Sequence, residues 1–406
     1  MKFLKSPLTP ITSALAISSW LLAQPGNAQP SNGLAPEITD LNAEDVSYQL
    51  EWKLPYLEKP FFTTRPQDQK DGLPVGSLGK DGGDAAKVLQ FAQNLAKESD
   101  NPKTGNTDSL LVAYKGKLLF ESYYRRGRIN YPHYQMSITK SYTAMAIGRA
   151  IQLGHFSMED LHKPVVTFLK DLDTGKLVKG AAQITLHEAM HMSSGIRVPK
   201  AKVAQLMKQP GQLRGQGQIQ AYLEHSSPIP PAPREFKYQG ADTAITMQVL
   251  EAVVPGTAED FIRKELLGKL GIAHYNWQED LSGLPKGAAG SSIRSRDMIK
   301  MGMLVMDNGK WKGEQLIPAE FIKVATSTIR KTHGNSSYGY YWWVESFEVE
   351  GKNYNGIQGR GAGGQFLFIF PELELVAVVT SHNRGMGKML RTLPQEIIPA
   401  FTQDSI

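Results

Sequence analysis

A serine and a lysine three residues apart have the types and spacing needed for nucleophilic chemistry. They lie in His133-Tyr-Gln-Met-Ser137-Ile-Thr-Lys140, at the start of a largely apolar run that continues to Leu153. Residues at i and i+3 share one face of a helix, so the Lys140 amine would lie beside the Ser137 hydroxyl. A serine hydroxyl needs such a neighbour to become a nucleophile, and a first helical turn offers unpaired N–H groups to an oxyanion. The stretch therefore favours acyl transfer on Ser137.

The Ser-x-x-Lys spacing is weak evidence when it stands alone. Ser77-Leu-Gly-Lys80 has the same spacing, but it lies in a glycine-rich loop with no helix to fix its geometry. Structural context decides between such matches, and the Ser137 match has a helix behind it. The alternative interpretation of Ser137 is a helix cap without chemistry, so the rest of the chain has to decide.

Composition and charge restrict the class of protein. The 406 residues are 41% hydrophobic and contain no cysteine, which excludes disulfides, thiol catalysis and zinc–thiolate sites.

The N-terminus has the pattern of a signal peptide over residues 1–28. It contains the basic residues Lys2 and Lys5, then an apolar stretch, and then the small-residue site Gly26-Asn27-Ala28. A membrane-anchoring or unstructured N-terminus is the alternative. Cleavage would lower the net charge from +6 to +4 and leave no membrane span. We therefore expect a periplasmic or secreted bacterial protein.

No pattern in the chain points to nucleic acid, a metal or an organic cofactor. Arg125-Arg126-Gly127-Arg128 is the densest basic group, and we interpret it as the solvated end of a hairpin. His187 and His191 have the i,i+4 spacing of metal ligands on a helix, but no third ligand accompanies them, so a structural role is favoured. We expect no cofactor and no metal. The sequence does not indicate an oligomeric state.

The order of predicted elements gives a fold class. Residues 29–75 show no sustained period and are interpreted as an extended N-terminal arm, followed by one domain over residues 76–406. A helix over 85–97 precedes a hairpin of strands 109–114 and 118–124, and strand character returns only near the C-terminus. The region of about 141–335 is predicted to be a helical lobe. Further strands are expected over residues 338–344, 366–370 and 374–380, and a closing helix over 387–401. This is an α+β arrangement, with an antiparallel sheet from both chain ends flanked by helices.

With this layout the chain resembles the serine β-lactamase and penicillin-binding-protein superfamily. The likeness is greater to its class C-like branch of esterases and 6-aminohexanoate-dimer hydrolases, and it runs from about residue 105 to residue 383. Ser137-Ile-Thr-Lys140 resembles the first motif of the family, and Gly361-Ala-Gly-Gly-Gln365 with the following hairpin is similar to its third motif. Ile184 to Gly195 and Tyr338-Gly-Tyr-Tyr-Trp-Trp343 resemble further family segments. The resemblance implies a β-lactamase/transpeptidase-like fold without metal or cofactor.

The resemblance also assigns roles outside the first motif. Tyr238, after a proline-rich approach, would be the proton shuttle, with a core or loop tyrosine as the alternative. A phenol has a pKa near 10, so it acts as a base only if a cation such as Lys140 lowers that pKa.

The chain departs from the family pattern at two places. Gly240 replaces a residue that usually carries a side chain able to bind the substrate or the lysine, and Asp242 is a weak candidate for that role. Gly361, Ala362 and Gly363 would form an edge strand that supplies an oxyanion N–H near Ala362; a plain glycine-rich turn is the alternative. Arg360 could replace the lysine of the missing Lys-Thr-Gly.

These residues imply an exported serine hydrolase that acts on a small-molecule ester or amide through an acyl-enzyme on Ser137. The first alternative is a β-lactamase or a D-Ala-D-Ala peptidase-like, penicillin-interacting enzyme. The second is a non-catalytic binding protein on the same fold.

Overall fold

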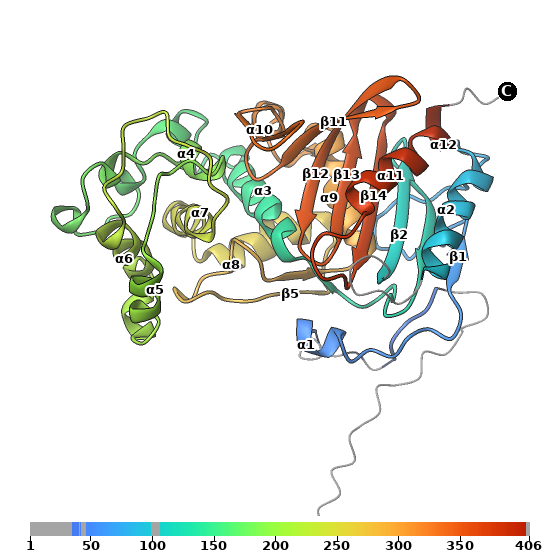
Figure 1. Cartoon of the computed structure of the whole chain (residues 1–406), viewed down its shortest axis with the longest axis horizontal. Coiled ribbons are helices and arrows are strands. Elements are labelled where there is room, and N and C mark those ends of the chain that lie inside the picture. Colours follow the sequence, from blue (N-terminus) through green and yellow to red (C-terminus); the bar gives the residue numbers. More distant parts are fainter. Residues whose placement is uncertain (1–34, 40, 42–45, 99–105, 403–406) are drawn as a thin grey trace, which may run out of the picture.

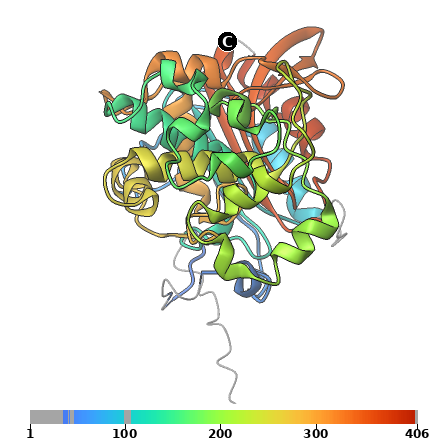
Figure 2. The ribbon, with the colours of Figure 1, turned by 90° about the vertical axis from the view of Figure 1, so that its left-hand side faces the viewer.

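The computed structural model of the protein describes residues 35–39, 41, 46–98 and 106–402. The predicted signal peptide lies outside these residues. Figure 1 shows an antiparallel sheet covered by helices on both faces, with a helical part extending from one side. Figure 2, turned by 90°, shows this helical part in front of the sheet. Within the described ranges, no helix is both long enough and apolar enough to cross a membrane.

The main sheet joins strands from both ends of the chain, as the order of predicted elements indicates. Its nine strands follow the order β1-β3-β2-β14-β13-β12-β11-β10-β9, and neighbours are antiparallel. The bounds are β1 Phe61–Thr63, β2 Thr107–Tyr114, β3 Lys117–Tyr123, β9 Arg330–Lys331, β10 Ser336–Tyr338, β11 Trp343–Val349, β12 Lys352–Gly361, β13 Gln365–Phe370 and β14 Leu375–Ser381. Two small sheets contain β4 His133–Tyr134, β5 Tyr275–Trp277 and β6 Ser291–Ile293, and β7 Lys310–Trp311 with β8 Glu314–Gln315. The predicted α+β class is confirmed.

The central strands are buried on both faces, which explains their nearly continuous apolar sequences. Along β13, Phe366, Phe368 and Phe370 face one core, whereas Leu367 and Ile369 face the other. Successive side chains of a strand point to opposite faces, so one run of residues supplies both cores. One core lies under α2 and α11, and the other lies under the helices of the inserted region.

The helices include most of those that the hydrophobic periodicity predicts. The helix α2 has the predicted bounds and begins at Asp84, whose carboxylate accepts the N–H groups of Ala86 and Lys87. The bounds are α1 Tyr48–Glu51, α2 Ala85–Lys97, α3 Thr139–Gln152, α4 Leu186–Met190, α5 Lys200–Leu206, α6 Gly217–His225, α7 Gly240–Val253, α8 Ala258–Phe261, α9 Ser295–Met306, α10 Ala319–Ala325, α11 Met389–Ile397 and α12 Pro399–Thr402. Those from α3 to α10 lie between the two groups of sheet strands along the chain.

The strand predicted over residues 338–344 is wrong in its central part. Residues 339–342 form a tight turn between β10 and β11, in which Tyr338 pairs with Trp343. Tyr341 has φ +61°, and a Cβ on Gly339 would lie 2.1 Å from the Ala325 carbonyl oxygen. The N–H of Tyr341 donates to the Met190 carbonyl, at 3.1 Å. The aromatic residues of this run have high strand propensity, but here residues 339–342 form a turn that packs against the helices.

The segment before residue 76 packs onto the domain through short elements. The strand β1 extends the sheet beside β3, and α1 lies near β4. The basic group at 125–128 holds this segment, so its interpretation as a solvated hairpin end is wrong. Arg128 is buried and donates to the Pro55 carbonyl at 2.9 Å, and the Arg126 guanidinium lies 4.9 Å from the Trp52 ring centroid.

A buried ion cluster at Arg296 is predicted to stabilise this attachment. Arg296 of α9 contacts Glu121 of β3 at 2.9 Å and Asp71 at 2.8 Å, and its side chain is 2% exposed. Replacing Arg296 by Met would leave two carboxylates without their partner, which costs about 3–5 kcal/mol of unfolding free energy in comparable buried pairs. Urea unfolding would measure this loss. Arg263→Met is the control, because its pair with Asp260 is half exposed and should contribute less than about 1 kcal/mol. Equal losses in the two variants would contradict the prediction.

Candidate active site

Ser137 lies where a short 3₁₀ turn, Met136–Ile138, leads into α3. Met136, directly before it, has φ +49°. A left-handed conformation is costly for a non-glycine residue, and such strain gathers at functional sites. The Ser137 side chain is partly exposed, whereas Lys140 is buried. The serine is thus open to solvent in part, and the lysine is buried.

The structure brings Lys140 and Ser137 together as the spacing predicts. The Lys140 Nζ lies 2.9 Å from Ser137 Oγ and donates a hydrogen bond to the Ala288 carbonyl oxygen at 2.6 Å. Burial and the nearby charge of Lys286 lower the pKa of the Lys140 amine to about 7. A substantial share of this amine is therefore neutral at pH 7, and its lone pair can accept the Ser137 proton. By contrast, Ser77 lies in a turn and Lys80 is exposed.

Tyr238 also reaches Ser137, although it comes from just before α7. Its hydroxyl is hydrogen-bonded to Ser137, and its ring centroid lies 4.7 Å from Lys140 Nζ. Burial of the hydroxyl raises the pKa of Tyr238, although the bond to Ser137 and the charge of Arg360 oppose this shift. The lowered phenol pKa that a basic role would need is thus not found. Tyr238 is therefore a neutral phenol at pH 7, and the group whose pKa is lowered is the Lys140 amine.

The third-motif strand runs directly past Ser137. A Cβ on Gly361 would lie 2.4 Å from the Gln135 carbonyl oxygen, and one on Gly359 would lie 3.0 Å from the Ile138 side chain. Both glycines are therefore needed for the close approach of β12 to the 3₁₀ turn. Ala362 and Gly363 follow in the turn between β12 and β13, with Ala362 exposed. The edge-strand prediction is wrong, since β12 lies between β11 and β13 inside the sheet.

Arg360 lies beside the site, but its charge is paired. Its guanidinium forms an ion pair with Glu345 and lies 4.7 Å from the ring centroid of Trp343. The Trp343 ring in turn lies 5.8 Å from the Tyr238 ring. Arg360 therefore fixes the wall of the site through Trp343, and Glu345 compensates its charge.

Asp242 does not replace the missing helper side chain at Gly240. It is fully buried and accepts hydrogen bonds from Ser194 and Gln239, and burial raises the pKa of its carboxyl to about 7.

The two histidines with i,i+4 spacing lie in packed surroundings. His187 is bonded to the Tyr340 hydroxyl at 2.6 Å, and its ring packs against those of His162 and His191. These groups are part of the packing around α4 and α7.

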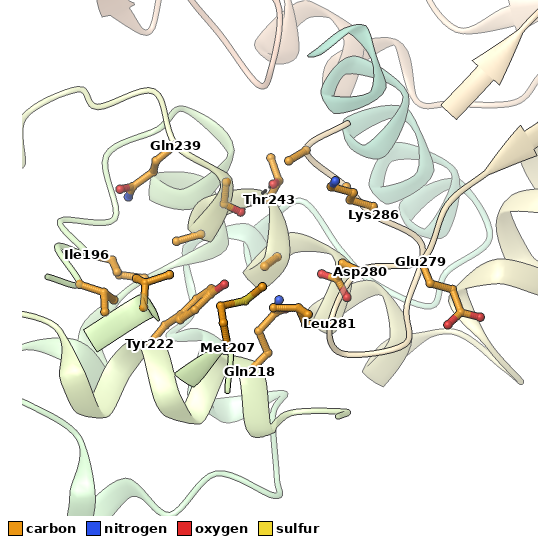
Figure 3. A pocket seen from close by; sticks show the side chains of 17 residues that line it. Ile196, Met207, Gln218, Tyr222, Gln239, Thr243, Glu279, Asp280, Leu281 and Lys286 are labelled. Carbon is orange, nitrogen blue, oxygen red and sulfur yellow. Dashed lines mark hydrogen bonds between the residues drawn. The ribbon is translucent and has the colours of Figure 1, made fainter. Parts of the chain in front are cut away.

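A cavity of about 630 Å³ is lined by residues next to Tyr238 and Lys140 in sequence or in contact, although Ser137, Lys140 and Tyr238 are not themselves among its lining residues (Figure 3). Gly240 and Ala288 line it, and these residues lie close to Tyr238 and Lys140 respectively. Figure 3 shows Tyr222, Met207 and Ile196 on one side and Lys286 on another. The remaining lining is mainly small or apolar, with Gln218, Gln239, Glu279 and Asp280 as polar members.

The sequence reasoning missed Lys286 and Ala288. Lys286-Gly-Ala-Ala-Gly290 follows a proline, and its glycines are the signal that could have indicated a close backbone approach. A Cβ on Gly287 would lie 3.0 Å from the Thr243 carbonyl oxygen. This loop lies 148 residues after Lys140, so no local spacing reveals the contact.

Solved structures with the same fold include several enzymes. EstCE1, a hydrolase with promiscuous acyltransferase activity, superposes with a TM-score of 0.61 at 14% identity, covering 78% of this chain and 99% of its own. A class C β-lactamase gives 0.60 at 16% identity, with 79% and 97% covered. A 6-aminohexanoate-dimer hydrolase-like protein from Bacillus anthracis gives 0.59 at 18% identity, with 84% and 88% covered. At these identities the likeness shows a shared fold.

The sequence itself gives the family. The profile of the Beta-lactamase family matches residues 103–398, which include Ser137, Lys140, Tyr238 and the turn at Ala362. This match spans most of the chain. The chain therefore belongs to the Beta-lactamase family of hydrolases, as the motifs and the fold indicate.

Proposed function

We propose that this protein is a serine hydrolase that cleaves an ester or an amide through an acyl-enzyme on Ser137. The observation that carries the proposal is the Lys140 amine, 2.9 Å from Ser137 Oγ and with its pKa lowered to about 7. A base is most effective when its pKa lies near the working pH. The signal-peptide pattern in residues 1–28 adds the proposal that the enzyme is exported.

The chemistry assigns one step to each group. Neutral Lys140 accepts the Ser137 proton as Oγ forms a bond to the substrate carbonyl carbon, which gives a tetrahedral oxyanion. Tyr238 donates its proton to the leaving oxygen or nitrogen as that bond breaks, and the Lys140 ammonium returns a proton to the phenol oxygen. Water then attacks the acyl-enzyme by the reverse sequence, releasing the acid and restoring Ser137. The oxyanion would be held by the N–H groups of Ser137 and Ala362.

The cavity and the charge arrangement support a substrate without an obligatory carboxylate. Arg360, which could have taken the place of the missing Lys-Thr-Gly lysine, is paired with Glu345. The cavity lined by Gly240 and Ala288 offers an apolar wall that includes Ile196, Met207 and Tyr222. Such a surface suits an apolar acyl or leaving group.

A β-lactam or D-Ala-D-Ala peptide is the second candidate substrate class. Lys286 favours it, because this lysine lines the cavity next to Lys140 and could attract a carboxylate. The non-catalytic alternative has less support, because a binding protein does not need an amine whose pKa is lowered beside a serine.

The first prediction concerns adduct formation on Ser137. The wild-type protein should gain the mass of one acyl or phosphonyl group with p-nitrophenyl esters or a fluorescent phosphonate, and Ser137→Ala should gain none. Intact-mass spectrometry measures both. Ser109→Ala is the control, because this buried serine is bonded to Ser295 and Thr380 inside the sheet region. Labelling by a fluorescent penicillin alone would support the second candidate, and no Ser137-dependent adduct with any reagent would favour the binding protein.

The second prediction concerns pH. If neutral Lys140 is the base, kcat/KM should rise with pH through a midpoint near 7. Lys286→Gln removes a positive charge that lowers the pKa of Lys140, so that pKa should rise. The ascending limb should then move to higher pH, and activity at pH 7 should fall. Lys310→Gln, an exposed substitution on β7, should leave the profile in place. A limb that stays fixed or moves to lower pH in Lys286→Gln would contradict this assignment.

The third prediction concerns the approach of β12 to Ser137. Gly361→Ala would place a Cβ 2.4 Å from the Gln135 carbonyl oxygen, so the strand must move and displace the Ala362 N–H. Losing one oxyanion donor typically lowers kcat by about 10²–10³, and we expect a fall of this order with a smaller change in KM. Gly211→Ala is the matched control, since a Cβ there meets no atom within 4 Å. Comparable kinetics for both variants would overturn the assignment of the oxyanion donor.

A further inference from the structure

A buried cluster of ionisable side chains lies behind the active site and takes no part in the proposed reaction. Glu51 of α1, His133 of β4 and His382, directly after β14, are each less than 10% exposed. One ligand atom from each lies within 4.8 Å of the others. Glu51 Oε1 contacts His133 Nδ1 and lies 3.6 Å from His382 Nε2. Three elements that are distant in sequence thus direct acceptor atoms at one point.

The outer hydrogen bonds fix how these side chains face that point. Asp108, fully buried in β2, lies 2.5 Å from His382 Nδ1, so Nε2 is the ring nitrogen that faces Glu51. His133 is hydrogen-bonded to the backbone of Ser381 through its other ring nitrogen. The Nδ1 atom of His133 is therefore the ring nitrogen that contacts Glu51. A histidine held by a carboxylate or a carbonyl in this way is typical of metal ligands.

The convergence leaves buried polar atoms, Glu51 Oε1 and His382 Nε2, without a hydrogen-bond partner among the described residues. A proton between His133 and Glu51 would satisfy that pair, but His382 Nε2 lies 3.6 Å from Glu51 Oε1 and has no hydrogen-bond partner among the described residues. A divalent ion would bind all three atoms at once. An unpartnered, buried nitrogen directed at a carboxylate is the observation that separates this cluster from an ordinary ion pair.

We propose that Glu51, His133 and His382 form a structural site for a divalent transition metal, with Zn²⁺ as the best match. Two imidazoles and one carboxylate are common ligands of zinc, which binds them at about 2.0–2.2 Å in tetrahedral geometry. Ligand atoms would then lie about 3.3 Å apart. The separation of 3.6 Å between His382 Nε2 and Glu51 Oε1 is close to this value, whereas His133 and Glu51 are in direct contact and would have to move apart. This proposal replaces the expectation from sequence that the chain holds no metal.

The position of the site suggests what the ion would stabilise. His133 lies four residues before Ser137, and Ser381 is bonded to the side chain of Gln365 at the start of β13. The segment that follows β14 stabilises the turn at Ala362, because the Asn383 N–H donates to the Gly363 carbonyl at 2.9 Å. A bound ion would link Glu51 of the N-terminal segment to His133, shortly before Ser137, and to His382, directly after β14. It would thus connect the N-terminal segment to both segments next to the proposed oxyanion site.

Direct metal binding tests the proposal. The full-length protein, freed of metal with a chelator, should bind one Zn²⁺ with a Kd of about 10 μM or lower in competition with a chromophoric chelator. Co²⁺ in its place should give the visible absorption of a tetrahedral ion. At Zn²⁺ a hundredfold above Kd, Tm should rise by about 3 °C or more. These readouts do not depend on activity, so they are independent of the proposed reaction.

Variants locate the site. Glu51→Gln and His382→Gln should each weaken Zn²⁺ binding at least about 100-fold, within the range seen for loss of a ligand or its support. His191→Gln is the matched control, a buried histidine outside the cluster that should leave binding unchanged. Should Glu51→Gln or His382→Gln fail to fold, the Co²⁺ spectrum of the wild type decides. Absence of binding at 100 μM Zn²⁺, a spectrum without tetrahedral bands, or binding lost in His191→Gln would overturn the proposal.

Discussion

The removal of one amine from water is the constraint on which the site depends. Lys140 is 4% exposed and is held between Ser137 Oγ and the Ala288 carbonyl. Burial disfavours the charged form of an amine, and in Lys140 burial has the largest effect on the pKa. The helix α3, the loop at 286–290 and the ring of Tyr238 all contribute to this burial. The basicity of Lys140 is therefore a property of the fold, rather than of the Ser-x-x-Lys spacing alone.

The sheet supplies the opposite wall of the site with little freedom to move. Because β12 lies between two long neighbours, its register is fixed on both sides by antiparallel pairs. A Cβ on either of the two glycines that face the 3₁₀ turn would press against Gln135 or Ile138, so their lack of a side chain allows the close approach. The proposed oxyanion donor, the Ala362 N–H, follows directly after this internal strand in the β12–β13 turn, so the strand fixes where the turn begins. Donors that are held in place need little reorganisation during a reaction.

Features that depend on residues close together in the chain, or on motifs in a fixed order, could be predicted from the sequence. Ser137 and Lys140 are three residues apart, and the β13–β14 hairpin follows from two apolar runs around one turn. Tyr238 and Ala362 could be assigned only through the resemblance to a known family. Lys286 and Ala288 could not be predicted, because their contact depends on how the inserted region folds back onto α3. The strand predicted through Tyr341 failed for a related reason. Its aromatic residues have high strand propensity, but contacts with Ala325 and Met190 impose a turn that local sequence does not encode.

The charges around Ser137 connect the state of the base with the choice of substrate. Glu345 neutralises Arg360, whereas Lys286 lines the cavity and its charge lowers the pKa of Lys140. A substrate carboxylate bound at Lys286 would cancel that charge. The pKa of Lys140 would then rise, and a smaller share of the amine would be neutral at pH 7. An anionic substrate would thus weaken the base that must act on it. In the proposed reaction, a neutral ester or amide would leave the charge of Lys286 in place and Lys140 in the state that can accept a proton.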